Sequence, residues 1–204
     1  MEPLLLPVGH DVGALHTAGG NRRQQVRAGR NLVELTDPEY VVWLLAHGTG
    51  DDDRPTRSSV AAAAERLEVS AADVTAITDQ LLAVGLLAEV DPEAGPAVDF
   101  AQRHQLIPLL MGLGPDQEEG VLQTIGLLGQ PIVQVSSAVY DVWAWAQLTP
   151  HLWIACQDAA EVARRVGVTA PDETEPREVL TGMLRSVHGL LCVRAAYLDR
   201  RGVA

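Results

Sequence analysis

Short apolar runs alternate in the first hundred residues with longer stretches in which apolar positions recur every three or four residues. The first pattern is typical of strands and the second of helices. Two short runs, Gln25–Arg27 and Asn31–Leu35, flank Gly29, and this arrangement predicts a β-hairpin. Thr36 and Glu39 follow with the spacing of a capping box, which predicts that a helix begins there.

Three helices and a closing strand are predicted after the hairpin. The first helix places large side chains on one face, at Tyr40, Trp43, Leu44 and His47. A second helix is predicted over roughly Ser59–Leu67, and Ser70 is the cap of a third. Gly85 ends the third helix, and Leu86–Val90 then returns as a strand toward the hairpin.

The same pattern recurs about 100 residues later in the chain. The matched positions share residue type and order: Val33 with Val133, Tyr40 with Tyr140, Trp43 with Trp143, and the Gly-Leu-Leu at Gly85 with that at Gly189. We infer a duplication, because several aromatic and apolar positions seldom agree in one order by chance. The second copy is slightly longer, and we place its extra residues at Ala170–Glu178.

The duplication predicts the elements of the second copy. They are a strand over Ile132–Val135, helices over Ser137–Ala146, Ala159–Val166 and Glu175–Val187, and a strand over Leu190–Ala195. Asp91–Ala97, with two prolines and a glycine, is the expected linker, and a bridging helix is expected from Val98 to about Met111.

A helix, a helix–turn–helix and a Gly-Leu-Leu that leads into a strand follow one another as in a winged-helix domain. We therefore predict an α+β but mainly helical fold, built from tandem winged-helix repeats with small β-hairpins. The first repeat spans residues 1–97 and the second spans residues 98–204.

Acidic residues outnumber basic residues by 27 to 15, for a formal net charge of −12. Nucleic acid and anionic lipid repel such a chain unless its bases gather on one face. All the bases are arginine, which we interpret as the habit of a GC-rich bacterial source. No signal-peptide pattern and no apolar stretch of the ~20 residues that cross a bilayer is present. We expect a cytoplasmic protein without membrane contact.

Catalytic and metal-binding patterns are absent from the sequence. The six histidines have no metal-ligand spacing with cysteine or carboxylate, and Cys156 and Cys192 are expected to be buried core thiols. No nucleophile elbow or phosphate-binding glycine pattern occurs. We therefore expect a protein that is not an enzyme and that uses no metal and no cofactor.

The charges near the predicted helix–turn–helix argue against DNA binding. Its third helix carries two acids and no base over Ala71–Gln80, although a winged helix that reads DNA inserts this helix between phosphates. One basic cluster surrounds the hairpin, at Arg22, Arg23, Arg27 and Arg30. It is either a phosphate-binding arm or, as we favour, a solvated face or a contact for acids of this chain or of a partner.

Two tryptophans have no counterpart in the first copy. Trp43 and Trp143 lie on apolar helix faces and are predicted to be core residues. Trp145 is turned about 200° around the helix from Trp143, and Trp153 follows a short loop. These two residues either fill an interface between the repeats or form a partner-binding patch, where tryptophan is enriched.

Three short segments resemble PqqD-like peptide-recognition domains: Val33-Glu34-Leu35-Thr36, Trp43-Leu44-Leu45 and Gly85-Leu86-Leu87. In that family a β-hairpin precedes a helix with a large apolar residue, and a short helix–turn–helix ends in Gly-Leu-Leu. The resemblance covers each half once. It implies a winged-helix fold and recognition of a peptide.

The order of hairpin and helices, with no catalytic motif, predicts a non-catalytic adaptor that binds a peptide or protein partner by β-augmentation. An extended segment would add to the strand Asn31–Leu35 and lie against the third helix. The candidate partner-binding residues are Arg27, Arg30, Asn31, Val33, Trp145 and Trp153. The alternative is a winged-helix DNA-binding transcriptional regulator that uses Arg22, Arg23, Arg27 and Arg30.

Overall fold

A computed structural model describes residues 2–16, 22–48, 54–115 and 122–200. The first half of the chain contains β1 (Leu4–Pro7), β2 (His10–His16), β3 (Arg22–Ala28), β4 (Asn31–Leu35), α1 (Asp37–Leu45), α2 (Arg57–Glu65), α3 (Ala71–Val84) and β5 (Leu87–Val90). The second half contains α4 (Ala97–Arg103), β6 (His104–Pro108), β7 (Met111–Pro115), β8 (Gln123–Leu127), β9 (Gln130–Val135), α5 (Ser137–Trp145), η1 (Ala146–Leu148), α6 (Leu152–Arg165), α7 (Pro171–Thr174), α8 (Pro176–Cys192) and β10 (Ala196–Arg200).

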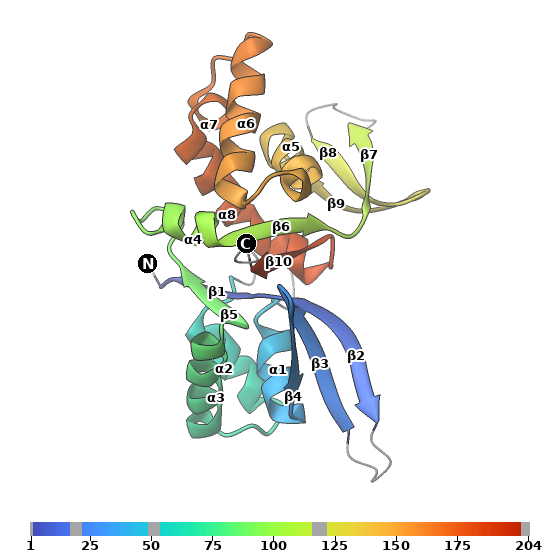
Figure 1. The fold of residues 1–204 in the computed structure, drawn as a ribbon, viewed down its shortest axis with the longest axis vertical. Coiled ribbons are helices and arrows are strands. Elements are labelled where there is room, and N and C mark those ends of the chain that lie inside the picture. Colours follow the sequence, from blue (N-terminus) through green and yellow to red (C-terminus); the bar gives the residue numbers. More distant parts are fainter. Residues whose placement is uncertain (1, 17–21, 49–53, 116–121, 201–204) are drawn as a thin grey trace.

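Each half combines one three-stranded sheet with one two-stranded ribbon. The sheets β2-β3-β4 and β7-β8-β9 are antiparallel meanders. The ribbons pair the first strand of each half with its last, β1 with β5 and β6 with β10. The order of strands and helices is the same in both halves, apart from the additions α4, η1 and α7 (Figure 1).

The prediction of a mainly helical fold of tandem winged helices is wrong, although α+β is right. Of the described residues, 47% are helical and 30% lie in strands, which form four small sheets. The prediction missed the ribbons because it identified neither of their first strands, and β6 lies inside the segment that was expected to be a bridging helix. The Leu4–Pro7 strand is four residues long, and such a segment becomes a strand only by pairing with a partner far along the chain.

We predicted that the last strand of the first half returns to the hairpin, and this prediction is wrong. The strand is β5, and it pairs with β1 in an antiparallel register in which Leu4 faces Val90 and Pro7 faces Leu87. The hairpin itself, the capped first helix and the third helix that ends at Gly85 are present as predicted.

The predicted strand over Leu190–Ala195 is also wrong, because α8 continues to Cys192 and the strand begins only at Ala196. Arg194, with φ of 54°, therefore takes the place of Gly85, with φ of 65°. The equivalence is visible in the hydrogen bonds that follow each turn. Leu86 N donates to Leu81 O at 2.8 Å, and Ala195 N donates to Leu190 O at 2.8 Å.

Two further boundaries in the second half differ from prediction. Helix α6 begins at Leu152, about two turns before the predicted start at Ala159. The bridging helix is confined to Ala97–Arg103, because the chain continues from His104 as the strand β6.

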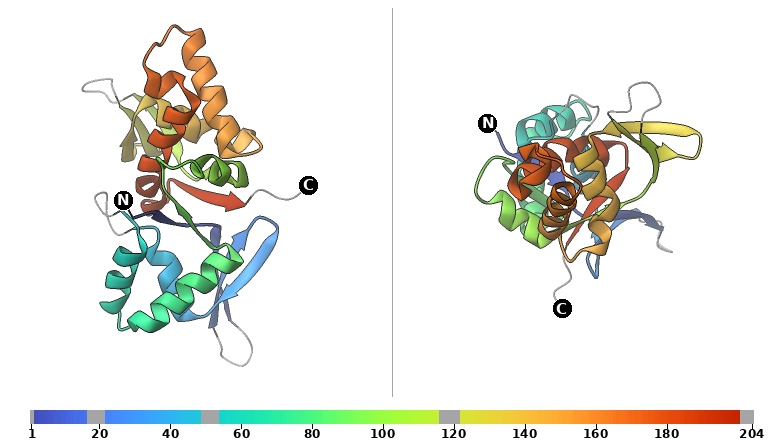
Figure 2. Two further views of the ribbon diagram at one scale, coloured as in Figure 1. Left: turned by 90° about the vertical axis from the view of Figure 1, so that its left-hand side faces the viewer. Right: turned by 90° about the horizontal axis from the view of Figure 1, so that it is seen from above.

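The β1–β5 ribbon lies between the helices of the first half and the second half (Figures 1 and 2). Successive side chains of a strand point to opposite faces. Leu5 packs in the core of the first half, whereas Leu4 and Leu6 pack in the core of the second half. Beyond the ribbon, Val8 forms a parallel bridge with Leu198 of β10, and Gly9 N donates to Leu198 O at 2.7 Å.

The predicted core tryptophans are buried and have similar roles. Trp43 and Trp143 are 1% and 3% exposed. The indole nitrogen of Trp43 donates to Val8 O at 3.3 Å, and that of Trp143 donates to Ala195 O at 3.0 Å. Each indole thus joins the first helix of its half to the backbone beside the two-stranded ribbon.

Candidate functional site

The strands β4 and β9 each form one edge of a three-stranded sheet, since each pairs with one neighbour only. An edge strand offers a row of backbone N–H and C=O groups to which a further strand can pair. The two strands occupy corresponding positions in the two halves, and β4 contains the segment that the sequence predicted as the binding edge.

An open groove of about 800 Å³ runs between β9 and α8; we call it the β9–α8 groove. Its lining comprises six consecutive residues, 131–136, together with Leu122, Arg185, Ser186, His188 and Gly189. Six consecutive residues along one wall mean that the groove follows the strand edge. The opposite wall is a side of α8 on which Arg185 is exposed and Ser186, His188 and Gly189 are half-buried.

Small residues on α8 leave this groove open. Ser186 and Gly189 lie about one turn apart on the helix, so they lie on the same side of it. A Cβ atom added at Gly189 would meet no atom within 4 Å. The glycine is therefore not required by close packing, and it leaves space where a side chain would project.

The backbone of β9 carries a bulge near its start. Gly126 pairs with Pro131 but the preceding Ile125 pairs with Val133, so one residue of β9 is unpaired. A Cβ atom at Gly126 would overlap Gln130 O, so this position requires glycine. The bulge bends the strand at the beginning of the groove.

The register shows which residues of the edge strands direct backbone groups outward. In the first half, Ala28 and Asn31 close a two-residue turn, so they form a hydrogen-bonded pair. Such pairs alternate with pairs that are not hydrogen-bonded, so the N–H and C=O of Glu34 point away from β3. Gln134 occupies the corresponding position in β9, where it faces Thr124 and is exposed.

The edge of β4, where the sequence placed the binding site, is less enclosed. Asn31 is exposed, and Val33 is partly buried against the core of the first half. A pocket of about 410 Å³ in this half lies between the start of α1 and α3, and no residue of β4 lines it. By contrast, the edge of β9, in the second half, shares a groove with a helix.

The arginine cluster predicted around the hairpin is divided in the structure. Arg27 donates to Asp199 Oδ2 at 3.0 Å and to the Tyr197 hydroxyl at 2.6 Å, both on β10. Gly29 N donates to the other carboxylate oxygen of Asp199 at 2.6 Å. Arg27 therefore joins the two halves, and the acid that it contacts belongs to this chain.

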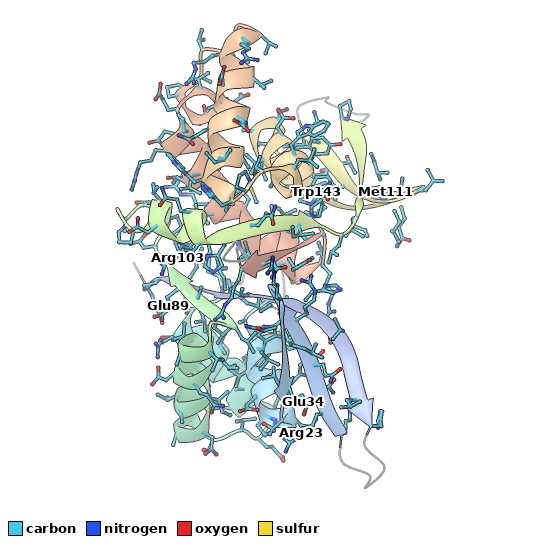
Figure 3. The ribbon with its side chains drawn as sticks, in the orientation of Figure 1. Arg23, Glu34, Glu89, Arg103, Met111 and Trp143 are labelled. Carbon is cyan, nitrogen blue, oxygen red and sulfur yellow. The ribbon has the colours of Figure 1, made fainter. Side chains whose placement is uncertain are left out.

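The remaining arginines of the cluster are exposed and spread along the hairpin. Arg22 and Arg23 lie at one end of β3, and Arg30 lies in the turn at the other end. Figure 3 shows Arg23 and Glu34 toward the end of the sheet that is remote from the second half. The structure does not bring the four arginines together, so the geometry gives the nucleic-acid alternative no support.

The two tryptophans without counterparts lie on different helices. Trp145, on α5, is 62% exposed, so it does not fill an interface between the halves. Trp153, on α6, is partly buried and packs against the core of the second half. The sequence analysis did not identify the groove residues of α8. The repeat does relate the predicted edge Asn31–Leu35 to residues 131–136, which line the groove, so the strand side of the site could have been found from the duplication.

Burial shifts the pKa values of Cys156 and His47 strongly. Burial raises the pKa of the Cys156 thiol to about 12, so the thiolate is scarce at neutral pH. Burial, with a smaller contribution from Arg194, lowers the pKa of His47 to about 4. Across the residues that the structure describes, no three His, Cys, Asp or Glu side chains gather as a metal-ligand set.

None of the helices in the described ranges is both long enough and apolar enough to span a bilayer. Comparisons of the chain with protein-family models, with curated proteins and with solved structures found no match.

Proposed function

We propose that the protein is a non-catalytic recognition protein that binds an extended peptide segment of a partner protein in the β9–α8 groove. The observation that carries the proposal is the alignment of an edge strand with an open groove of about 800 Å³ whose other wall is a helix. This arrangement is the one in which a peptide gains main-chain hydrogen bonds on one side and side-chain contacts on the other.

The peptide would add to the three-stranded sheet as a fourth strand. The outward N–H and C=O groups of Gln134 are the backbone groups best placed to pair with it. Six residues of lining at about 3.3 Å each give an edge of roughly 20 Å, the length of an ordinary strand. Alternate side chains of the peptide would then point toward α8.

The lining of the groove favours a peptide with apolar and acidic residues. Leu122 and Ile132 are 38% and 37% exposed, so they offer apolar surface to alternate side chains. Arg185 contacts Glu93, and both side chains are more than half exposed. An exposed ion pair of this kind contributes little to stability, so a peptide carboxylate can replace Glu93.

The edge of β4 remains the corresponding site in the first half. We place the primary site at β9 because a helix faces this strand edge across a shared groove, whereas no residue of β4 lines the pocket of about 410 Å³ in the first half. Arg27 also pairs with Asp199 of this chain, so an acidic partner at β4 would have to displace that carboxylate.

A random 12-residue peptide display library provides the test, followed by fluorescence anisotropy of the selected peptides. Gly189→Glu projects a charged side chain into the groove, and Gly182→Glu makes the same change elsewhere on α8. A Cβ atom meets nothing within 4 Å at either glycine, so both variants should fold. We expect Gly189→Glu to weaken binding at least tenfold and Gly182→Glu to leave it unchanged.

Gln134→Pro is a second variant, because it removes an outward backbone donor while leaving the paired carbonyls of the sheet in place. It should weaken the same peptides. If the library yields no binders, or if Gly189→Glu and wild type bind them equally, the proposal fails.

A further inference from the structure

A second concave site lies between α5 and α6; we call it the α5–α6 pocket. Its volume is about 230 Å³, and its lining residues are Asp141, Trp145, Thr149, Ala155, Asp158, Ala159 and Val162. Sites for drug-sized ligands are usually about 300–1,000 Å³, so this pocket is suited to a single side chain. It shares no residue with the β9–α8 groove.

Helical spacing brings the lining residues together. Asp141 and Trp145 are four residues apart on α5, so they lie on one face. On α6, the small side chains of Ala155 and Ala159 form the floor, and Asp158 lies beside them. The indole of Trp145 forms an exposed wall.

The two carboxylates of the pocket are unpaired within the described part of the chain. Asp141 and Asp158 make no hydrogen bond or ion pair with any residue there, and both are exposed enough to meet a ligand. Loss of solvent around Asp141 raises its pKa, which means that its charge is incompletely stabilised. A cation at this position would stabilise it.

The first half supplies an internal comparison. A pocket of about 190 Å³ lies at the corresponding place between α1 and α2, with Leu45, Ser59 and Ala63 among its lining residues. Helices α2 and α6, which form one wall of each pocket, end alike. Val69 N donates to Ala64 O at 3.2 Å after α2, and Val168 N donates to Ala163 O at 3.0 Å after α6.

This correspondence matches Leu45 with Trp145, Ser59 with Asp158, and the position of Val41 with Asp141. The buried Trp43 and Trp143 are the same in both halves, whereas the pocket positions differ. The aromatic wall and both carboxylates are therefore particular to the second half.

We propose that the α5–α6 pocket binds the side chain of an arginine residue of a partner polypeptide. The planar guanidinium stacks on the indole of Trp145, and Asp141 and Asp158 neutralise its charge. The aliphatic stem of the arginine lies along the apolar floor. A lysine ammonium is more strongly hydrated and stacks less well, so it binds more weakly. The proposal stands independently of peptide binding in the β9–α8 groove.

The test uses the pentapeptide amide Gly-Gly-Arg-Gly-Gly and follows the four tryptophan indole N–H signals by NMR. Trp145→Phe assigns the relevant signal. We expect the arginine peptide to shift the Trp145 signal in a saturable way. The citrulline peptide, which has the same shape without the charge, should not shift it, and the lysine peptide should bind about fivefold more weakly.

Variants of the two pocket carboxylates test whether these side chains contact the bound guanidinium. Asp141→Asn and Asp158→Asn should each weaken the arginine peptide about fivefold. Asp99→Asn, an exposed site on α4 with the same change in charge, should not weaken it. Unchanged Trp43 and Trp143 signals verify that each variant is folded, and Gly189→Glu should bind the arginine peptide normally.

Three outcomes would overturn the proposal. The citrulline or lysine peptide could bind as well as the arginine peptide, which would show that the guanidinium is not recognised. The arginine peptide could leave the Trp145 signal unmoved. Dilution of the protein alone could shift that signal, which would make the occupant a second copy of this chain.

Discussion

At the residue scale, a left-handed backbone position follows the third helix of each half, and different residues occupy it. Gly85 adopts φ of 65°, and a Cβ atom there would collide with the guanidinium of Arg200. That guanidinium also donates through Nε to Gly85 O at 3.0 Å. Arg194 adopts φ of 54° although it has a side chain, which costs about 1 kcal/mol of backbone strain. Its guanidinium forms an ion pair with Asp11 at 3.6 Å.

Gly85→Ala should therefore destabilise the protein by about 1–3 kcal/mol, because it combines backbone strain with displacement of Arg200. Gly95→Ala is the matched control, since its Cβ atom would meet nothing within 4 Å and its φ is not positive. Urea unfolding measures both variants. Equal midpoints would contradict the role assigned to Gly85.

His47 contributes a pH dependence at the same scale. Its ring lies against Trp43, and its Nδ1 is 3.2 Å from the carbonyl oxygens of both Trp43 and Leu44. Burial and the nearby Arg194 lower its pKa from 6.5 to about 4, against smaller opposing effects of the hydrogen bonds to the Trp43 and Leu44 carbonyls and of Asp11. The folded state therefore keeps this histidine neutral at pH values where the unfolded chain protonates it.

Between pH 6.5 and pH 4 the unfolded state binds more protons at His47, so stability falls as the pH falls. The loss from this group is about 3 kcal/mol at pH 4, and nothing further changes above pH 7. Denaturant unfolding at several pH values measures it. His47→Asn should flatten the dependence in this window, and an unchanged slope in that variant would rule out His47 as the cause.

At the scale of elements, the start of α1 is stabilised by a carboxylate that α5 lacks. Glu39 accepts from Thr36 N at 2.7 Å and from the Thr36 hydroxyl at 2.8 Å. At the start of α5, the Ser136 hydroxyl accepts from Val139 N at 3.4 Å, and valine cannot reciprocate. The sequence motif of the first helix thus corresponds to real contacts.

Glu39→Ala should destabilise the protein by about 1 kcal/mol, because it leaves Thr36 N without its partner and removes an acceptor for the Gln80 amide. Glu65→Ala, at the exposed end of α2, should change stability by less than about 0.5 kcal/mol. Thermal unfolding compares the two variants, and an effect of Glu65→Ala as large as that of Glu39→Ala would count against the capping role.

At the scale of the whole molecule, the β1–β5 ribbon belongs to both cores. Leu5 is fully buried in the first, and Leu6 is fully buried in the second, although the two residues are adjacent. The contact of Arg27 with Asp199 adds a polar link between the halves. Loss of the ribbon would expose apolar surface in both halves at once, so we expect them to unfold together.

Leu6→Ala should cost about 2–5 kcal/mol, as is usual for deletion of a buried leucine side chain. The loss should appear in one cooperative transition that involves both halves. Indole NMR signals of Trp43 and Trp143 report on each half separately during denaturation. Different midpoints for the two signals would show that the ribbon does not couple the halves.

The sequence by itself determined the features that depend on near neighbours. The β3–β4 hairpin follows from Gly29, the start of α1 from Thr36 and Glu39, and the end of α3 from Gly85. Each signal acts within a few residues, through turn geometry or helix capping, so it is readable without knowledge of the rest of the chain. The burial of Trp43 and Trp143 follows in the same way from helical periodicity.

Only the tertiary structure decided the pairings between distant segments. β1 is a strand because β5, some 80 residues away, completes it, and Arg27 is engaged because folding brings Asp199 to it. The groove beside β9 likewise depends on where α8 lies. Short strands have weak intrinsic preferences, and their partners are selected by packing of the whole molecule, which no local pattern records.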